Sequence, residues 1–503
     1  MNVMMLLEMA SATFPDRVAF IDSSDGTSLT YEQLFRAAGQ RAAGLQTAGH
    51  SRMAMLDVTS LATPLGLFTS AWAGLPYVPL NYRLTGAEIQ ALLQRVTPAY
   101  LVTDVERHGE FHGLPDVVAT TRSHFLDDAH HDGAPGEWPM DPDDIAVLLF
   151  TSGTTGAPKA AVLRHKHLVS YILGSVEFAS ADEHEAALVT VPPYHVAGIA
   201  AILSSVYAGR RVVQLSAFTP QAWLDVARRE AVTSAFLVPT MLARIIEALE
   251  GQQTADLPAL ASVSYGGGKM PLPVIERAMA LFPDTDFTNA YGLTETSSTI
   301  SLLGPDEHRA AAASRDPALR RRLASVGQAL PGVEIQIRDD EGRVLGPNQR
   351  GEIYVRGEQV SGEYEGRGHT TDAEGWFPTR DAGSVDAEGY LFLEGRADDV
   401  IVRGGENMSP GEIEDTLIGH PAVRDAAVVG VADEQWGEAV AAVVVLTPGR
   451  TADAAELQAW VKTHMRSSRV PQTVVFVDEL PYTETGKLLR RVVREWLAVP
   501  DGG

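Results

Sequence analysis

Short apolar runs alternate with segments of helical pattern through the first 300 residues of the chain. The runs are bounded by turn residues and fall at 53–58, 77–79, 99–103, 145–150, 187–191, 212–215 and 234–238. Runs of this length, separated by stretches long enough for a helix, are typical of βα units. The pattern therefore predicts mostly parallel sheets covered by helices.

Beyond residue 330 the pattern changes to that of hairpins. Apolar stretches at 333–337, 351–356 and 390–393 are separated by the acidic, glycine-containing turn sequences 339–342 and 386–389. Closely spaced strands with such turns favour an antiparallel sheet or barrel. This segment is therefore expected to add a small β-barrel-like part to the first domain.

A small α+β unit is predicted to begin near Arg396. Residues 409–412 read Ser-Pro-Gly-Glu, a capping box with proline at the first helical position, which predicts a helix over 411–418. The remaining predicted elements are strands at 426–431, 439–446 and 474–477, a helix near 455–464 and a last helix from 488. We therefore predict an α/β protein with a large N-terminal domain over 1–396 and a small, mobile α+β domain over 397–503.

Charge and cysteine content restrict the function. The formal net charge of −25 disfavours binding to nucleic acid or to an anionic membrane, and the densest basic stretch, 320–322, is interpreted as a solvated helix face. With no cysteine, the chain has no disulfide, thiolate metal site or cysteine nucleophile. Residues 1–9 lack the basic lead-in of a signal peptide and fit an amphipathic helix, so we expect a cytoplasmic enzyme without a membrane span.

Lysine is rare, since arginine supplies nearly all the positive charge. Only five lysines occur, at 159, 166, 269, 462 and 487. A compact ammonium group suits a position where one oxygen must be reached, whereas arginine grips two. Positions that keep lysine are therefore candidates for a specific role.

The strongest motif is the hydroxyl- and glycine-rich loop at 150–159, directly after a predicted buried strand. Its glycines let backbone N–H groups converge on anionic oxygens, while hydroxyls add donors and the lysine neutralises charge. The spacing is wrong for a Walker A loop. It resembles the phosphate-binding signature of the adenylate-forming superfamily, which includes acyl-CoA synthetases, peptide-synthetase adenylation domains and luciferases. The resemblance implies phosphate binding by Thr151, Ser152, Gly153, Thr154, Thr155, Gly156 and Lys159.

Further motifs extend the resemblance to the rest of a nucleotide site. Residues 289–295 match a motif in which Tyr291 offers an aromatic face to adenine, Thr294 a hydroxyl to the α-phosphate and Glu295 a carboxylate to magnesium. The other residues implied to bind nucleotide are Gly266, Gly267, Asn289, Ala290, Gly292, Asp381, for the ribose hydroxyls, and Arg396. The glycine run at 266–268 would also fit a simple turn.

The C-terminal unit carries the remaining matches. Lys487 falls at the catalytic lysine of the superfamily, which implies that it bridges the substrate carboxylate and the α-phosphate. Asp398 falls at the hinge, although an acidic surface turn is the alternative. Gly404, Gly405 and Glu406 resemble the loop that reaches the pantetheine tunnel when the small domain rotates.

The segment 193–198 resembles the part of the superfamily that lines the acyl pocket. His195 takes the position that gates the carboxylate end, although a lone histidine is more often structural. No aspartate stands here to hold an α-ammonium group, and residues 196–200 are apolar or small. An apolar acid is therefore expected, with a linear fatty acid preferred over aryl, cyclic or sterol-derived acids.

Together these motifs imply an AMP-forming acyl-CoA ligase that uses ATP, Mg²⁺ and coenzyme A. One alternative acceptor is the phosphopantetheine of a free carrier protein. Another alternative is a nucleotide-binding pseudoenzyme, favoured only by Ala160 and Arg380, which replace glycines usual in the superfamily. Lys269 also departs from the small or apolar residue expected at its position, and the sequence assigns it no role.

Overall fold

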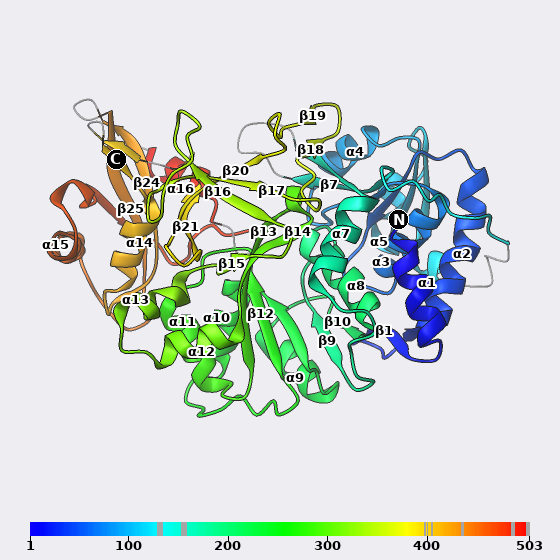
Figure 1. Ribbon diagram of the computed structural model, residues 1–503, viewed down its shortest axis with the longest axis horizontal. Helices are drawn as coiled ribbons and strands as arrows, with labels where there is room; N and C mark the ends of the chain where they lie inside the picture. Colours follow the sequence, from blue (N-terminus) through cyan, green and yellow to red (C-terminus); the bar gives the residue numbers. More distant parts are fainter. Residues whose placement is uncertain are drawn as a thin grey trace.

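The computed structural model describes residues 1–127, 134–151, 158–396, 399, 401–403, 406–433, 437–483 and 488–498. Two large sheets and the helices around them form the N-terminal part, and a smaller sheet with its own helices forms the C-terminal part (Figure 1). The helices are α1 Met4–Thr13, α2 Tyr31–Thr47, α3 Ala62–Ala73, α4 Gly86–Gln94, α5 Val105–Phe111, α6 Arg122–Leu126, α7 His165–Ser175, α8 Val196–Ala208, α9 Pro220–Arg229, α10 Pro239–Ala248, α11 Leu272–Leu281, α12 Pro305–Ala313, α13 Pro317–Arg320, α14 Pro410–Ile418, α15 Ala454–His464 and α16 Arg490–Ala498.

The first large sheet has the strand order β15-β14-β13-β12-β11-β9-β10-β1-β2. Its central strands run parallel, whereas β2, β14 and β15 are antiparallel to their neighbours. The strands are β1 Val18–Asp22, β2 Ser28–Thr30, β9 Ala186–Val189, β10 Arg211–Gln214, β11 Ser234–Leu237, β12 Ser262–Gly266, β13 Asp286–Leu293, β14 Ser298–Leu303 and β15 Gln328–Ala329.

The second large sheet has the order β19-β18-β8-β7-β4-β3-β5-β6. Strands β3 to β7 are parallel, and β8, β18 and β19 are added antiparallel. The strands are β3 Arg52–Leu56, β4 Tyr77–Pro79, β5 Ala99–Thr103, β6 Val117–Thr121, β7 Ile145–Thr151, β8 Lys159–Arg164, β18 Glu363–Tyr364 and β19 Gly368–His369. The prediction of mostly parallel sheets is therefore confirmed.

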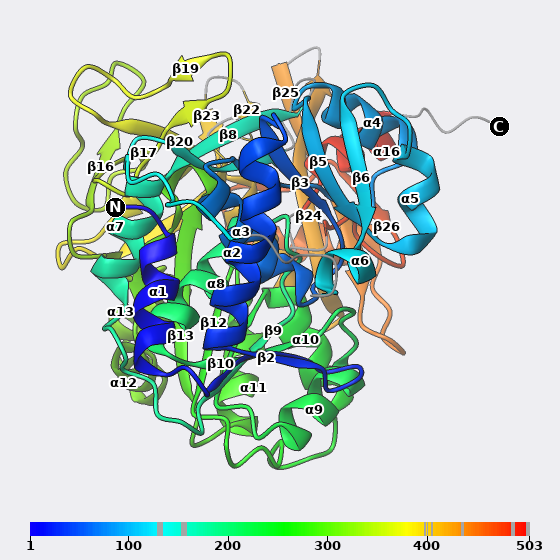
Figure 2. The same ribbon diagram turned by 90° about the vertical axis from the view of Figure 1, so that its right-hand side faces the viewer.

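Helices fill the space between the two large sheets. One hydrophobic cluster joins Phe20 of the first sheet and Met53 of the second to apolar side chains of α1, α2, α3 and α8 (Figure 2). Burial of these apolar faces is the main stabilising term of the layered arrangement. The cluster therefore fixes the two large sheets relative to each other.

The C-terminal strands form two smaller sheets, one antiparallel and one mixed. Strands β16 Glu334–Arg338, β17 Gly351–Arg356, β20 Phe377–Val385 and β21 Leu391–Arg396 make a four-stranded antiparallel sheet, as the hairpin pattern predicted. The last sheet contains β22 Ile401–Arg403, β23 Glu406–Met408, β24 Val423–Asp433, β25 Gly437–Leu446 and β26 Thr473–Phe476. It is mixed because β26 runs parallel to β25.

The last sheet is covered on both faces because residues of β24 alternate between two cores. Val428 packs in a cluster with α14 and α15, whereas Val429 packs in another with Val493 of α16. The boundary predicted between 396 and 397 falls between β21 and β22 and stays a prediction.

One detail of the predicted helix start is wrong. Ser409 is the N-cap of α14 but makes no capping hydrogen bond, so the capping box does not form. The Ser409 hydroxyl instead donates to the Glu394 carbonyl at 2.7 Å. Since Ser409 is only 4% exposed against β21, its hydroxyl satisfies a neighbouring strand rather than its own helix.

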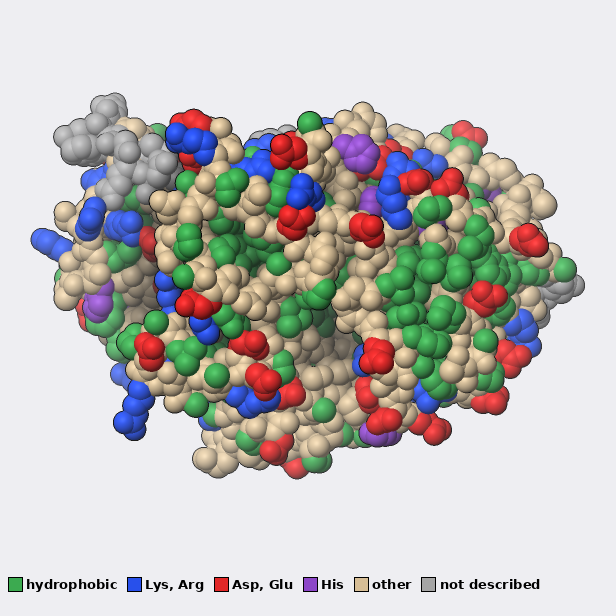
Figure 3. Space-filling view, viewed as in Figure 1, with side chains coloured by type: hydrophobic (Ala, Val, Ile, Leu, Met, Phe, Trp, Pro, Cys, Tyr) green, Lys and Arg blue, Asp and Glu red, His purple; other side chains and the backbone are tan. Residues whose placement is uncertain are grey.

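Charged side chains of both signs are interspersed on the face drawn in Figure 3, and apolar side chains gather over the N-terminal helices. The basic stretch 320–322 is not only a solvated helix face. Arg321 lies over the ring of Phe392 at 4.4 Å, and Arg322 lies over the ring of Tyr390 at 4.1 Å. Among the described residues, no helix combines the length and the apolar character needed to cross a bilayer.

Candidate active site

The predicted phosphate loop joins two antiparallel strands. Thr151 ends β7 and Lys159 begins β8, and the two residues are paired in register, with the Thr151 hydroxyl 3.4 Å from the Lys159 carbonyl. Ser152, Gly153, Thr154, Thr155 and Gly156 lie outside the described residues. Their contact with phosphate stays a prediction, and the hairpin fixes where the loop begins and ends.

Tyr364 links this hairpin to Glu295, the predicted magnesium ligand. The Tyr364 hydroxyl donates to Glu295 Oε1 at 2.5 Å, and the Lys159 ammonium group lies 5.3 Å from the centre of the Tyr364 ring. Burial, followed by the nearby Glu295 carboxylate, raises the pKa of Tyr364, so the hydroxyl keeps its proton and acts as a donor. Lys159, Tyr364 and Glu295 therefore form one connected group.

No sequence motif marks Tyr364 as a site residue. It belongs to β18, which pairs with β8 through Tyr364 and Ala161, and this long-range pairing brings its side chain beside the phosphate hairpin. The backbone N–H groups of Ser361 and Gly362 also donate to the Glu295 carbonyl, at 2.8 and 3.2 Å. The segment before β18 thus fixes the Glu295 backbone as well as its carboxylate.

Asp381, predicted to bind ribose, lies in a second polar group. Its Oδ1 accepts from Arg396 Nη1 at 2.8 Å, and its Oδ2 accepts from the Tyr291 hydroxyl at 2.7 Å. Burial and the adjacent carboxylate raise the pKa of Tyr291 well above its ordinary value, so Tyr291 remains a donor. Each Asp381 oxygen can accept a further hydrogen bond, as ribose hydroxyls would require.

The two polar groups are joined along the chain because Tyr291 lies near the end of β13, which ends at Leu293, and Glu295 follows Tyr291 by four residues. Thr294, which opens the short 3-10 helix Thr294–Thr296, lies between them. The Tyr291 side chain is only 8% exposed, so its stacking on adenine stays a prediction. The fold therefore brings predicted residues from three distant motifs to one place.

Two of the predicted glycines are required by close backbone contacts. A Cβ atom on Gly266 would lie 2.2 Å from the Ala290 carbonyl oxygen, and one on Gly292 would lie 1.8 Å from the Ser298 carbonyl oxygen. Gly267 has φ of 79°, a left-handed conformation that favours glycine. The glycine run is thus a tight strand end beside β13, which allows a ligand to approach the backbone.

Asn289 has a structural contact in addition to its predicted role. It is 6% exposed, and its Nδ2 donates to the Ser325 carbonyl at 2.9 Å. This hydrogen bond ties β13 to the segment that precedes β15. Any contact of Asn289 with nucleotide stays a prediction.

His195, the predicted gate of the acyl pocket, is the N-cap residue of α8. Beside it, Tyr194 packs edge-on against Tyr82 with ring centroids 5.5 Å apart, and burial raises the pKa of Tyr194 to about 12. Ile199, predicted to line the acyl pocket, is fully buried in the core between the sheets, and its contact with the acyl group stays a prediction. The region around the α8 N-terminus is apolar, as the sequence predicted.

The C-terminal residues of the prediction are only partly described. Lys487, Gly404, Gly405 and Asp398 lie outside the described residues, and of Glu406 the structure describes the backbone, in β23. Their roles in catalysis, coenzyme A binding and hinge motion stay predictions.

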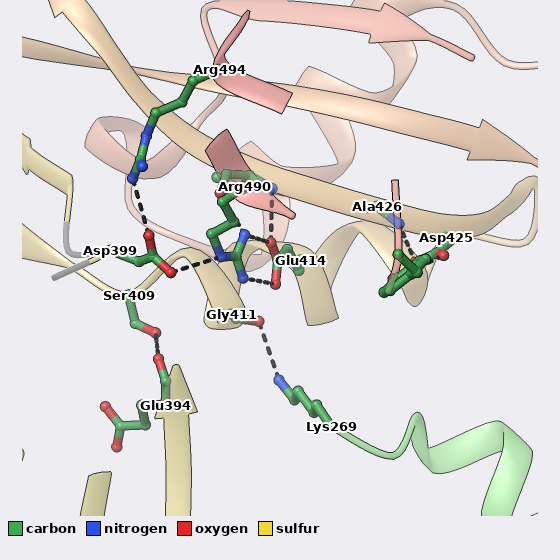
Figure 4. A network of polar contacts seen from close by, with 12 residues as sticks. Lys269, Glu394, Asp399, Ser409, Gly411, Glu414, Asp425, Ala426, Arg490 and Arg494 are labelled. Atoms are coloured by element: carbon green, nitrogen blue, oxygen red, sulfur yellow. Dashed lines mark hydrogen bonds and ion pairs between the residues drawn. The ribbon is translucent and has the colours of Figure 1, made fainter. Parts of the chain in front are cut away.

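An ion-pair network that no sequence motif indicated lies next to the predicted hinge (Figure 4). Arg490 contacts both Glu414 oxygens, and it lies 3.3 Å from Asp399, which Arg494 also contacts at 3.2 Å. The network ties the start of α16 to α14 and to Asp399. Only the spacing of Arg490, three residues after Lys487, could have drawn attention to it.

Arg380 stands where the superfamily usually has glycine, and its backbone explains the preference. Its φ is 63°, which a non-glycine residue adopts only with strain. The conformation is retained despite the substitution, and Asp381 remains paired with Arg396 and Tyr291. This departure therefore gives no support to a pseudoenzyme.

Comparisons with known proteins identify the family of this chain. The family model described as AMP-binding enzyme matches residues 7–365, and the model of the AMP-binding enzyme C-terminal domain matches residues 412–487. The chain belongs to the AMP-binding enzyme family. This membership confirms the adenylate-forming resemblance and the prediction of an ATP-dependent, AMP-forming ligase.

Relatives of this family match along nearly the whole chain. A fatty acid–[acyl-carrier-protein] ligase, ScoC, from Streptomyces coeruleorubidus is 34% identical over 94% of this chain and 92% of its own length. A feruloyl-CoA synthase from an Amycolatopsis species is 34% identical, with 93% of this chain and 94% of the relative covered.

The fold also matches solved structures of the family. The o-succinylbenzoate CoA synthetase MenE from Bacillus subtilis, in complex with its acyl-adenylate intermediate OSB-AMP, matches with a TM-score of 0.84 and 28% identity, over 99% of this chain and 98% of that one. The same enzyme has been solved with ATP and a magnesium ion, with a TM-score of 0.82, 28% identity and coverage of 97% and 98%. The predicted fold class is confirmed.

Proposed function

We propose that this AMP-binding enzyme is an ATP-dependent acyl-CoA ligase for an apolar carboxylic acid. The reaction joins the acid to AMP with release of pyrophosphate, and coenzyme A then displaces AMP to give the acyl thioester. The observation that carries the proposal is the pair of connected groups, Lys159–Tyr364–Glu295 and Tyr291–Asp381–Arg396, in a chain that matches such enzymes along its length.

The first step brings a carboxylate to a triphosphate, so positive charge and donors must offset the repulsion between two anions. Lys159, at the mouth of the phosphate hairpin, supplies charge to the leaving pyrophosphate. Arg396 pairs with Asp381 and is 31% exposed, so its guanidinium charge lies beside the place where the ribose and the α-phosphate would bind. Lys487 is assigned to the carboxylate and the α-phosphate, in the first step only.

Magnesium fits the site as a cation shared between protein and nucleotide. In the parts of the chain that are described, no cluster of three or more His, Asp and Glu side chains could hold a metal alone. Magnesium commonly uses one or two carboxylates together with phosphate oxygens, and it neutralises phosphate charge when bound. Glu295 would supply that carboxylate, with Tyr364 occupying one oxygen and orienting the other.

The identity of the acid is part of the proposal. The relatives named above act on a fatty acid and on ferulate, so both a linear and an aryl chain are compatible with this family. The apolar region at the α8 N-terminus has no aspartate for an α-ammonium group, which favours an acid without one. We retain a linear fatty acid, and a cytoplasmic location, as the proposals to test.

The test is a panel of linear fatty, aryl and α-amino acids assayed with ATP, Mg²⁺ and coenzyme A. AMP formation that depends on both the acid and coenzyme A supports the proposal, and the preferred acid identifies the pocket. Carboxylate-dependent exchange of pyrophosphate into ATP should be lost in Lys487→Ala, while thioester formation from supplied acyl-adenylate is kept. Exchange that persists in Lys487→Ala would remove that residue from the mechanism.

A carrier protein is the second candidate acceptor, favoured by the similarity to ScoC. The panel is therefore repeated with a holo acyl carrier protein in place of coenzyme A. If the carrier is acylated and coenzyme A is not, the acceptor assignment is wrong while the adenylation step stands.

A further inference from the structure

Lys269 connects the glycine-rich strand end to the small C-terminal unit. Its Nζ lies 2.5 Å from Asp415 Oδ2. It also lies 3.4 Å from the Gly411 carbonyl oxygen, a contact drawn in Figure 4. Both partners belong to α14. Gly411 is 142 residues and Asp415 is 146 residues from Lys269 in the sequence. The nucleotide-side glycines Gly266 and Gly267 precede Lys269 by three and two positions, so the contact begins next to the site.

The two partners on α14 lie one turn apart on the same helix face, because residues four apart are stacked on a helix. One ammonium group therefore contacts a carboxylate and a backbone carbonyl at once. The neighbouring Glu414 is turned to Arg490 instead (Figure 4). Helix α14 is thus held on one side by the small unit itself and on another by the N-terminal part of the chain.

The Lys269–Asp415 ion pair is exposed to solvent and therefore weak enough to break and re-form. The side chains are 48% and 59% exposed, and pairs so exposed add little to folding stability. The same small free energy changes a conformational equilibrium severalfold when only one of the two states contains the pair. An ion pair that is unimportant for folding can therefore matter for the orientation of a domain.

We propose that Lys269 is a positioning residue, which acts through Asp415 and the Gly411 carbonyl to stabilise the described orientation of the small unit. This inference rests on the proposed function, together with the rotation of the small domain between the two half-reactions that the family resemblance implies. Loss of the contact lowers the population of one orientation and raises that of the other. Lys269 therefore sets the ratio of the two half-reaction rates.

The test measures both half-reactions in Lys269→Ala and Asp415→Ala. Adenylation is followed by pyrophosphate exchange, and thioester formation by release of AMP from supplied acyl-adenylate in the presence of coenzyme A. We expect the ratio of the two rates to change by about 2- to 5-fold in the same direction in both variants. The reversed pair, Lys269→Asp with Asp415→Lys, should restore most of the original ratio.

Lys166 and Asp143 provide a matched control within the N-terminal part. Their charged atoms are 2.6 Å apart and their side chains are 48% and 61% exposed, so the pair is equivalent in distance and exposure. Lys166→Ala should leave the ratio unchanged. A change as large as that in Lys269→Ala would show a general effect of lost charge and would overturn the proposal, as would an unchanged ratio or an equal fall of both rates in Lys269→Ala.

A second readout is independent of activity. Because the chain has no cysteine, labels can be attached at two introduced cysteines, such as Ala318→Cys on α13 and Lys462→Cys on α15, both exposed. The distance distribution between the labels should shift in Lys269→Ala and return in the reversed pair, and an unchanged distribution overturns the proposal. If the wild-type chain instead lacks both half-reactions, the proposed function fails while the distance measurement still tests the contact.

Discussion

Glu414 and Asp381 are both poorly exposed carboxylates held by an arginine. The two pairs differ in their other hydrogen-bond partners and in the exposure of the arginine. The Glu414 and Arg490 side chains are 10% and 14% exposed, and the Val428 N–H donates to the same Glu414 oxygen that Arg490 contacts. Asp381 is 14% exposed, but its partner Arg396 is 31% exposed. We call the first pair closed and the second open, because the carboxylates are similarly shielded but Arg396 is more exposed than Arg490.

The difference separates a structural ion pair from a functional one. A closed pair has no donor or acceptor left for a ligand, so its role is to join elements, here α14, β24 and α16. In the open pair, each Asp381 oxygen accepts one side-chain hydrogen bond and has a second lone pair that a ligand or water can use. Substitutions at the two places should therefore affect different measurements, stability at the first and nucleotide binding at the second.

The largest effect is expected at the closed pair. Arg490→Leu leaves the Glu414 carboxylate buried without its cation, which should lower the free energy of unfolding by about 3–5 kcal/mol. Urea unfolding followed by tryptophan fluorescence measures the loss. Arg491→Leu is the control, because Arg491 is 74% exposed and its pair with Glu495 should matter by less than about 0.5 kcal/mol. Equal losses in the two variants would contradict the distinction.

At the open pair, Asp381→Asn should weaken catalysis with little change in stability. Loss of a charged acceptor for ribose is expected to lower kcat/KM for ATP by about 10- to 100-fold, mainly through KM. Asp372→Asn is the control, since Asp372 pairs with Arg338 at 2.9 Å outside the site. If Asp381→Asn instead lowers the melting temperature and leaves KM unchanged, Asp381 belongs with Glu414 as a structural residue.

Tyr364→Phe should have a smaller and more selective effect. The variant keeps the ring beside Lys159 but removes the hydroxyl that orients Glu295, so affinity for MgATP should fall by about 5- to 10-fold. Calorimetry with ATP in EDTA should show no comparable loss.

Tyr354→Phe is the matched control for Tyr364→Phe. Arg338 lies 4.4 Å from the centre of the Tyr354 ring, so this variant also removes a hydroxyl while it keeps a ring beside a cation. A similar loss of MgATP affinity in this control, or an equal loss with and without magnesium in Tyr364→Phe, would contradict the orienting role.

Local patterns were sufficient to predict the sheets and the motifs, because parallel strands and glycine-rich turns are encoded by neighbouring residues. The strands at 77–79 and 99–103 were predicted with the bounds that the structure has, and the family assignment followed from the loops. Long-range contacts were not predictable in this way. Tyr364 reaches Glu295 through strand pairing, and Lys269 reaches Asp415 across 146 residues, so neither contact has a local signal.

The capping box at Ser409 shows a related limit, because here a local pattern is present but its predicted hydrogen bond does not form. The local sequence was correct for a helix start, and α14 does begin at Pro410. The hydroxyl was nevertheless taken by the Glu394 carbonyl of β21, because tertiary packing placed a better acceptor beside it. Local sequence therefore predicts an element more reliably than it predicts the hydrogen bonds at its ends.

The smallest expected effect tests whether the open pair depends on strain beside it. Arg380 has a φ of 63° and lies 3.9 Å from Glu352 with 61% exposure, so it has a costly backbone and little compensating contact. Arg380→Gly should stabilise the fold by about 0.5–1 kcal/mol, measured by urea unfolding. Asn348→Gly, at a φ of 61°, should gain less because asparagine tolerates this conformation better. An unchanged KM for ATP in Arg380→Gly would show that Asp381 is held by Arg396 and Tyr291, whereas a changed KM would show that the strained residue also positions it.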